Sequence, residues 1–300
     1  MATVPISREA AAGGGDVVVR RTTGARWRRR GWSLAMYAAL LFFLAIFLLP
    51  FFWIWFSAFK SSLEIALDPF GLPKEWLWSN LEKAWTVGRF DRYIGNSILY
   101  CVTIVSGVVV LSCLAGYALA SLALPAQNVI LTTFLLGLMV PFQSLMIPMY
   151  YLLHDLRMLE TYFAFIVPGI AVGLPFGIFL MRGFFRGLPP EIGDAARLDG
   201  ANEWQVFRQI MFPLSAPGVA TLIVFQFMAT WKSFLMPLIF VQRDDLRPVA
   251  LGMMFFFGRF TADRGMIAAG VTIAMLPTVI LYLLLQRRFI EGMTAGALKA

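Results

Sequence analysis

Long apolar stretches with almost no charged side chains recur along this 300-residue chain, and they constrain its fold more than any other feature. Lipid offers no hydrogen-bond partner to backbone N–H and C=O groups, so a stretch that crosses the membrane must be a helix of about 20 residues. Hydrophobic residues make up 59% of the sequence and charged residues only 14%, which excludes an ordinary soluble globular protein. The sequence therefore predicts an all-α polytopic membrane protein with six transmembrane helices, at about residues 33–58, 94–122, 129–153, 162–185, 217–240 and 264–286.

Several prolines fall inside these predicted spans or near their ends. Neighbouring helices can satisfy the backbone carbonyls that a proline leaves free, so a kink within a membrane-spanning helix is tolerated. We therefore expect the prolines to bend the helices without changing the number of spans. They are Pro50, Pro141, Pro148, Pro168, Pro175, Pro237 and Pro277.

The distribution of basic residues predicts the orientation of the spans. Loops rich in Lys and Arg close to a span stay on the cytoplasmic side, and a block of arginines precedes the first span. An even number of spans then places both termini in the cytoplasm, together with the loop after the fourth span. The net charge of +8 is explained by this topology, so we expect membrane lipid and no nucleic acid as a contact. The arginines before the first span are Arg20, Arg21, Arg26, Arg28, Arg29 and Arg30.

The first apolar run is far longer than the 7–15 residues of a secretory signal core, so we interpret it as an uncleaved anchor. The segment before it is rich in Ala, Gly and Arg and lacks periodicity, which predicts disorder. The expected organisation is a disordered basic cytoplasmic tail (1–31), a first transmembrane helix (32–59), an extracytoplasmic loop (60–91), a transmembrane core (92–287) containing a cytoplasmic loop (186–213), and a cytoplasmic C-terminal tail (288–300).

Residues that carry out catalysis or bind metals are sparse. The one histidine, His154, lies beside Asp155 and Arg157 at the end of a span, where an interfacial polar role is expected. No lysine follows a glycine, so the phosphate-binding Gly-Lys-Ser/Thr sequence of an ATPase is absent. No acidic residue lies within a predicted span, although a membrane-embedded enzyme would need such residues to hold a cation. We predict no catalytic or metal site, and a polytopic membrane enzyme is the alternative.

The loop at 186–213 is polar and has the pattern of two short helices. Pro189 and Pro190 suit a first helical turn, where Glu191 places negative charge near the positive end of the helix dipole. Gly200 is placed to adopt the left-handed conformation that ends a helix. The pattern predicts a first helix of about ten residues and then a sharp glycine turn.

A second helix is predicted directly after this turn. Asn202 and Gln205 have the spacing of a capping box, and Pro213 is expected to stop the helix. Its apolar face would contain Val206, Phe207, Ile210 and Met211. In the first helix, the small side chains of Ala195 and Ala196 would let the surface of another protein come close. We therefore expect a protein partner on this side of the membrane.

The same loop resembles a known motif, the EAA loop of type-1 ABC importer permeases, whose usual form is roughly E-A-A-x-x-D-G-A followed by F-x-x-I-x-L-P. The matching residues are Ala195, Ala196, Asp199, Gly200, Ala201, Phe207, Ile210 and Pro213. Over roughly residues 33–300 the chain resembles the smaller, six-span permease of maltose-type carbohydrate importers. The motifs outside the loop are Asn96-Ser97, Ala115-Gly116-Tyr117-Ala118, Leu174-Pro175-Phe176, Phe184-Phe185, Trp231, Phe234, Gln286, Phe289, Gly292, Gly296, Ala297 and Lys299.

The chain departs from this family pattern at several positions. Asp194 replaces the usual Glu, and Phe212 replaces the usual Leu, which are mild changes. Lys232 stands where the family usually has Asn after Trp231. A basic residue and a Phe that usually follow Tyr117-Ala118 are replaced here by Ser121-Leu122-Ala123-Leu124.

The resemblance implies a mechanism and a set of partners. A short coupling helix in the loop would sit in a groove of a cytoplasmic ATPase subunit, and closing of the ATPase dimer would switch the permease from inward-open to outward-open. The implied partners are a second homologous permease, two ATPase subunits that bind ATP and Mg²⁺, and an extracytoplasmic solute-binding protein, in the bacterial cytoplasmic (inner) membrane. This chain itself would bind no cofactor. The residues expected to couple it to the ATPase are Glu191, Asp194, Ala195, Ala196, Arg197, Asp199, Gly200, Ala201, Phe207, Ile210 and Pro213.

Polar residues within spans are candidates for the substrate pathway, because an apolar solvent makes them costly. Hydrogen bonding between helices is the alternative explanation for them. Lys232 either faces a water-filled path or extends its ammonium to the outer interface. A sugar or oligosaccharide is the expected solute, with glycerol phosphate or a polyol as the alternative. Gly169, Gly173 and Gly177 are expected to form a packing ridge. The pathway candidates are Gln143, Ser144, Gln226, Trp231 and Lys232.

Overall fold

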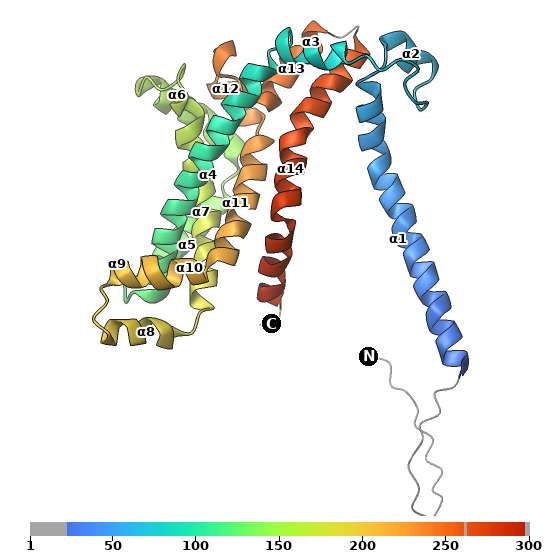
Figure 1. The fold of residues 1–300 in the computed structure, drawn as a ribbon. Helices are drawn as coiled ribbons and strands as arrows, with labels where there is room; N and C mark the ends of the chain where they lie inside the picture. Colours follow the sequence, from blue (N-terminus) through green and yellow to red (C-terminus); the bar gives the residue numbers. More distant parts are fainter. Residues whose placement is uncertain (1–22, 261–262, 298–300) are drawn as a thin grey trace, which may run out of the picture. The chain divides into compact units, whose positions relative to one another are not determined.

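The computed structural model describes residues 23–260 and 263–297, and this part of the chain contains helices and no strands (Figure 1). The α-helices are α1 (Thr23–Ser57), α2 (Ser62–Leu67), α3 (Ser79–Thr86), α4 (Phe90–Ser121), α5 (Gln127–Met139), α6 (Phe142–Asp155), α7 (Phe163–Arg186), α8 (Pro190–Leu198), α9 (Glu203–Gln205), α10 (Phe212–Leu214), α11 (Ala216–Trp231), α12 (Leu235–Phe240), α13 (Val249–Arg259) and α14 (Arg264–Ala297). A π-helix, η1 (Val206–Met211), and a 3₁₀-helix, η2 (Asp244–Leu246), complete the set.

Four stretches of continuous helix are long and apolar enough to cross a membrane: Trp32–Ser57, Phe90–Ser121, Phe163–Arg186 and Arg264–Leu284. Two bent pairs meet the same criteria when each pair is taken together. One is α5 with α6, bent by 98°, and the other is Glu203–Leu214 with α11, bent by 73°. The predicted all-α membrane fold is confirmed, and the count reaches six when each bent pair is one span.

Two predicted spans are not the continuous helices that the sequence suggested. The third span breaks at Val140, whose backbone is extended (φ −77°, ψ 115°) immediately before Pro141. A proline disfavours helical geometry in the residue before it and cannot donate a backbone hydrogen bond, so a break replaces the expected kink. In the predicted fifth span, α11 ends at Trp231 and residues 232–234 leave the helix before α12 begins.

Helix ends also differ from the predicted boundaries of the tails. Helix α1 begins at Thr23, within the predicted tail 1–31, and residues 1–22 of that tail lie outside the described part. Helix α14 continues to Ala297, past the predicted boundary at 287. The apolar runs therefore mark the spans, while helical structure extends beyond them.

The chain divides into two compact units, Met1–Phe52 and Trp53–Ala300. In the first unit, every side chain from Trp32 to Phe52 is exposed. In the second unit, α8 and α9 lie at one end of the helix bundle and α3 and α13 lie at the other (Figure 1). We call these the α8 end and the α13 end.

Helices α4 and α7 form the centre of the second unit, and small residues bring them close together. A Cβ atom on Gly169 would lie 2.6 Å from Cδ1 of Ile104, and one on Gly177 would lie 2.2 Å from Oγ of Ser112. On the opposite helix, a Cβ on Gly116 would lie 2.9 Å from the backbone nitrogen of Arg182. The expected packing ridge of glycines on α7 is therefore present, and Gly116 supplies a matching close contact from α4.

The segment at 60–91 is anchored to the end of α1 within the second unit. The Nδ2 atom of Asn80 donates to the carbonyl oxygens of Ala58 and Lys60, both at 3.0 Å. The buried Lys60 donates from Nζ to the carbonyl of Asp68 at 2.8 Å. The two bonds from Asn80 satisfy carbonyls directly after the end of α1, and the bond from Lys60 satisfies the carbonyl of the residue that follows α2.

Candidate functional site

The loop between α7 and α11 folds as helix, turn and helix, as the sequence predicted. Pro189 precedes α8, Pro190 opens it, and Glu191 lies in its first turn, where the helix dipole favours negative charge. Gly200 ends this arrangement with a φ of +89°, a conformation that favours glycine. The N–H groups of Gly200 and Ala201 then bond to carbonyls of the last turn, at 3.1 and 3.0 Å.

The predicted capping box opens the second helix of the loop. The N–H of Gln205 donates to Oδ1 of Asn202 at 2.9 Å, and the N–H of Asn202 donates to Oε1 of Gln205 at 2.8 Å. Each side chain therefore satisfies a backbone N–H that the helix start would leave free. A short-range signal in the sequence was enough to locate this cap.

The next turns differ from the prediction. Residues 206–211 form the π-helix η1, whose Val206, Phe207 and Met211 are buried in the core. Pro213 does not stop the helix as expected. It lies in the first turn of α10, where a missing N–H costs little, and the chain bends at Ser215 instead.

The two faces of α8 have different roles in the structure. Ala195 is exposed, but Ala196 is only 8% exposed and, with Gly193, faces the chain's own core. A Cβ on Gly193 would lie 2.9 Å from Cε of Met211 in η1. Of the two alanines expected to admit a partner, only Ala195 is open to one. The other exposed residues of the predicted coupling set are Glu191, Asp194, Asp199, Gly200 and, on α10, Pro213. Leu198, in the last turn of α8, is 89% exposed.

A polar network connects α8 to α4 through the start of α9. Arg197 donates from Nη1 to Asp194 at 2.7 Å and from Nε to Oε1 of Glu203 at 2.7 Å. Oε2 of Glu203 accepts hydrogen bonds from Nη2 of Arg197 at 3.3 Å and from the hydroxyl of Tyr117 at 2.7 Å. We call these four residues the inner network. The bond to Glu203 raises the pKa of Arg197 above its ordinary value, so this side chain stays charged.

Sequence reasoning missed two members of the inner network. Tyr117 was noted only as part of a motif, and Glu203 was not noted. Tyr117 lies at the α8 end of α4, where its ring packs against Phe185 of α7 and Phe207 of η1, at centroid distances of 5.7 and 5.2 Å. Only the contact across 86 positions of sequence identifies the role of Glu203, and no local signal could have revealed it.

The structure separates the five candidate pathway residues. Gln226 lines a cavity of about 400 Å³ together with Thr230, Ser233, Phe165, Phe176 and Gly173. Its Nε2 atom donates to Oγ1 of Thr230 at 3.4 Å. A Cβ on Gly173 would lie 2.8 Å from Oε1 of Gln226, so the glycine leaves room for the amide. This cavity combines polar and aromatic groups.

The other four candidates lie elsewhere. Trp231 is buried against α14, where its Nε1 atom donates to the carbonyl of Ala274 at 3.3 Å, and it lines a separate apolar cavity of about 590 Å³. Lys232 is exposed in the break between α11 and α12. Gln143 and Ser144 are exposed in the first turn of α6. Only Gln226 therefore has a place in the mixed cavity.

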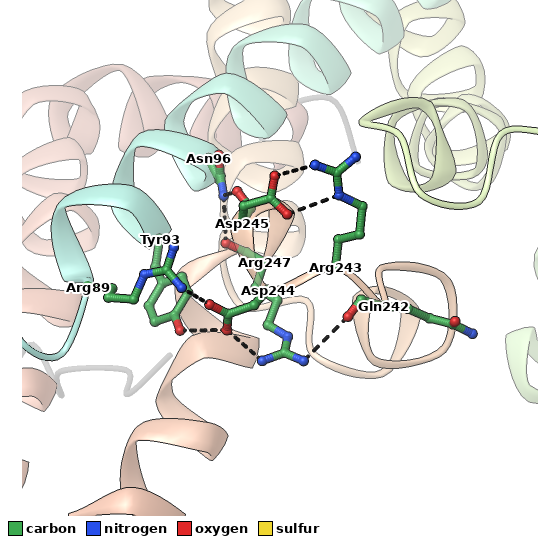
Figure 2. Close-up of polar contacts among 8 residues, drawn as sticks. All are labelled: Arg89, Tyr93, Asn96, Gln242, Arg243, Asp244, Asp245 and Arg247. Carbon is green, nitrogen blue, oxygen red and sulfur yellow. Dashed lines mark hydrogen bonds and ion pairs between the residues drawn. The ribbon is translucent and has the colours of Figure 1, made fainter.

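A second polar cluster lies at the α13 end and includes the motif residues Asn96 and Ser97. Nδ2 of Asn96 donates to the carbonyls of Asp245 and Arg247, at 2.8 and 3.0 Å (Figure 2). The hydroxyl of Tyr162 donates to Oδ1 of Asn96 at 3.0 Å. The N–H of Val249 donates to Oγ of Ser97 at 2.7 Å. Side chains at the start of α4 thus bond to backbone groups of the segment between α12 and α13 and of the first residue of α13.

Charged side chains reinforce this attachment. Asp244 accepts hydrogen bonds from Arg89, from the hydroxyl of Tyr93 at 3.0 Å and from Arg247 at 2.7 Å (Figure 2). Arg243 donates to both carboxylate oxygens of Asp245, at 3.0 and 2.6 Å, and this contact holds the pKa of Asp245 below its ordinary range. We call the residues of these two paragraphs the outer cluster: Arg89, Tyr93, Asn96, Ser97, Tyr162, Arg243, Asp244, Asp245, Arg247 and Val249.

Comparison with known proteins gives consistent matches along the chain. Residues 108–294 match the family described as "Binding-protein-dependent transport system inner membrane component". The diacetylchitobiose uptake system permease protein NgcG of Streptomyces coelicolor is 30% identical over 272 residues, which cover 90% of each chain. The arabinooligosaccharides transport system permease protein AraQ of Halalkalibacterium halodurans is 32% identical, over 89% of this chain and 96% of the relative.

A solved structure has the same fold. One chain of a bacterial ABC transporter involved in the import of the acidic polysaccharide alginate aligns with a TM-score of 0.77. The alignment covers 87% of this chain and 97% of the other, at 21% sequence identity. At this identity the likeness shows the fold alone.

Proposed function

This chain belongs to the family of binding-protein-dependent transport system inner membrane components, and from that premise we propose that it is the membrane-spanning permease subunit of an ATP-driven importer. It moves a sugar or oligosaccharide across the cytoplasmic membrane by alternating access. The observation that carries this proposal is the helix–turn–helix loop with α8 exposed at the end of the bundle. The positive-inside rule places this end in the cytoplasm.

Helix α8 is the contact with the ATPase in this proposal. Its exposed side offers Ala195, Leu198 and acidic side chains to a groove of the partner, while Gly193 and Ala196 pack against η1. Packed cores resist continuous deformation, so a displacement of α8 moves η1 and the helices that contact it. ATP binding in the partner subunits thereby changes which side of the membrane the pathway faces.

The complete importer contains further chains. Two ATPase subunits bind ATP and Mg²⁺, a second homologous permease completes the pathway, and an extracytoplasmic solute-binding protein delivers the solute. The family description names binding-protein dependence, which supports the last partner. This chain contributes the membrane path and its coupling contact, with no cofactor of its own.

The cavity around Gln226 supports a carbohydrate as solute. Amide and hydroxyl groups can bond sugar hydroxyls, and the rings of Phe165 and Phe176 can stack on the C–H surface of a sugar ring. The names of the two relatives given above include diacetylchitobiose and arabinooligosaccharides.

Purification of the chain from its native membrane in mild detergent tests the proposal. A second permease and an ATPase with a phosphate-binding loop should co-purify with it, and a co-purifying binding protein can be denatured to release and identify its solute. Recovery of this chain alone, even after cross-linking, would contradict the importer and favour a stand-alone carrier or membrane enzyme.

A further inference from the structure

We propose that Glu203 and Tyr117 are positioning residues that fix the orientation of α8 relative to the membrane-spanning helix α4. This inference rests on the proposed function, because it assigns to the inner network the transmission of α8 movement into the membrane. Sequence patterns at the loop suggest a contact with the ATPase. They do not suggest how that contact reaches the pathway.

The geometry of Glu203 suits a rigid bridge. Both of its carboxylate oxygens are engaged by Arg197, at 2.7 and 3.3 Å, and one of them also accepts the Tyr117 hydroxyl at 2.7 Å. A guanidinium that contacts both oxygens of a carboxylate fixes direction as well as distance. The last turn of α8, the first residue of α9 and the end of α4 therefore share one carboxylate.

The other connections of α8 are the chain itself and apolar packing, which are less directional than hydrogen bonds. At one end the chain passes through Gly200, which has wide conformational freedom, and along its inner face only Gly193 and Ala196 are buried. Residues this small present little side-chain surface to η1. Among the residues that the structure describes, the inner network supplies the side-chain hydrogen bonds that connect α8 to the membrane-spanning helix α4.

The exposure of these side chains indicates that their hydrogen bonds orient α8 and contribute little to the stability of the fold. The side chains of Arg197 and Glu203 are 32% and 48% exposed, and exposed ion pairs contribute little to folding. Tyr117 is only 5% exposed because its ring is packed between Phe185 and Phe207, so its fold contribution comes from the ring. Removing the hydroxyl alone leaves that packing in place and breaks the bridge.

The test uses the whole importer in proteoliposomes, with Ser233→Cys as a reporter in the cavity beside Gln226. The rate of labelling by a membrane-impermeant maleimide is measured with and without MgATP and vanadate, and nucleotide trapping is measured in parallel. In the reporter background, we expect trapping to change the labelling rate by about 5-fold or more, the lower end of usual coupling factors. The chain without the reporter corrects for the buried Cys101 and Cys113.

Tyr117→Phe and Glu203→Ala should each assemble and trap nucleotide normally, yet lose most of the change in labelling rate. The double variant should behave like either single one, because both changes break the same bridge. Tyr151→Phe and Glu82→Ala, on the exposed surface far from the inner network, serve as matched controls that keep the full response.

Two results distinguish this inference from the proposed function. If the reporter background traps no nucleotide and shows no change in labelling, the importer assignment itself fails. If the background responds and Tyr117→Phe responds equally, the importer stands and the bridge has no role in coupling. Loss of assembled complex in Tyr117→Phe would also overturn the inference, since it would show a structural role for the hydroxyl.

Discussion

At Gly200 the backbone has a φ of +89°, and no other group lies within 4 Å of the position of an added Cβ. Substitution there is therefore opposed by backbone conformation alone. Side chains in the left-handed region cost about 1–2 kcal/mol per residue, which is enough to shift the turn that follows α8.

Gly200→Ala should leave membrane insertion and complex abundance near normal, while the amount of ATP hydrolysed per solute imported rises about tenfold or more. The ratio is measured in proteoliposomes with the solute released from the co-purified binding protein. Gly95→Ala is the matched control, because it too has open space around it but lacks a positive φ. An unchanged ratio for Gly200→Ala would remove the turn from the coupling mechanism.

Asn96 illustrates how one buried amide can hold a whole segment. Its side chain is 6% exposed and makes three hydrogen bonds in the outer cluster. Asn96→Ala should destabilise the protein by about 1–3 kcal/mol, because the partly buried carbonyls of Asp245 and Arg247 lose their donor. A lower thermal midpoint of the purified complex, with faster proteolysis between α12 and α13, is the expected result. Asn128→Ala, at an exposed position, should change neither.

Helices α4 and α7 approach each other closely at glycines, which have no side chain to hold the backbones apart. A Cβ on Gly116 would lie 2.9 Å from both a backbone nitrogen and the Cβ of Met181, and backbone cannot move aside as a flexible side chain can. Gly116→Leu should therefore force the helices apart and cost about 1–3 kcal/mol or more. Reduced yield and a lower thermal midpoint of the complex check this, against Gly183→Leu, which has open space on α7. Equal stability of the two variants would contradict the tight contact.

Helices with strong local signals were predicted well from sequence. The prolines, first-turn acid and glycine turn define α8, and the Asn202–Gln205 capping box defines the start of α9. Local signals failed where distant packing decides the geometry. The π-helix η1 and the end of α11 at Trp231 have no nearby residue type that requires them.

The pathway is a property of the whole molecule, because its walls come from separate helices. Gln226 on α11 and Phe165 on α7 line the same cavity, whereas Gln143 lies exposed on α6. Gln226→Leu should keep the complex assembled and lower solute uptake several-fold, because a sugar loses an amide partner within an apolar wall. Uptake by cells and the yield of complex are the measurements. If Gln143→Leu lowers uptake and Gln226→Leu does not, the pathway lies elsewhere.

The sequence by itself determined the membrane class, the apolar spans, the loop at 186–213 and its helix–turn–helix form. Each of these depends on composition or on residues a few positions apart, where hydrophobicity, capping and backbone preference act directly. It also supplied the family resemblance, which the comparisons support. Its candidate site residues were chosen by type and by motif.

Tertiary structure alone decided which of those residues meet. Tyr117 reaches Glu203 across 86 positions, and Asn96 reaches the backbone of Asp245 across 149. It also turned Ala196 inward, placed Trp231 against α14 and left Gln226 in the mixed cavity. Such contacts depend on how helices pack around small residues, and that packing is a sum of many distant interactions that no single stretch of sequence contains.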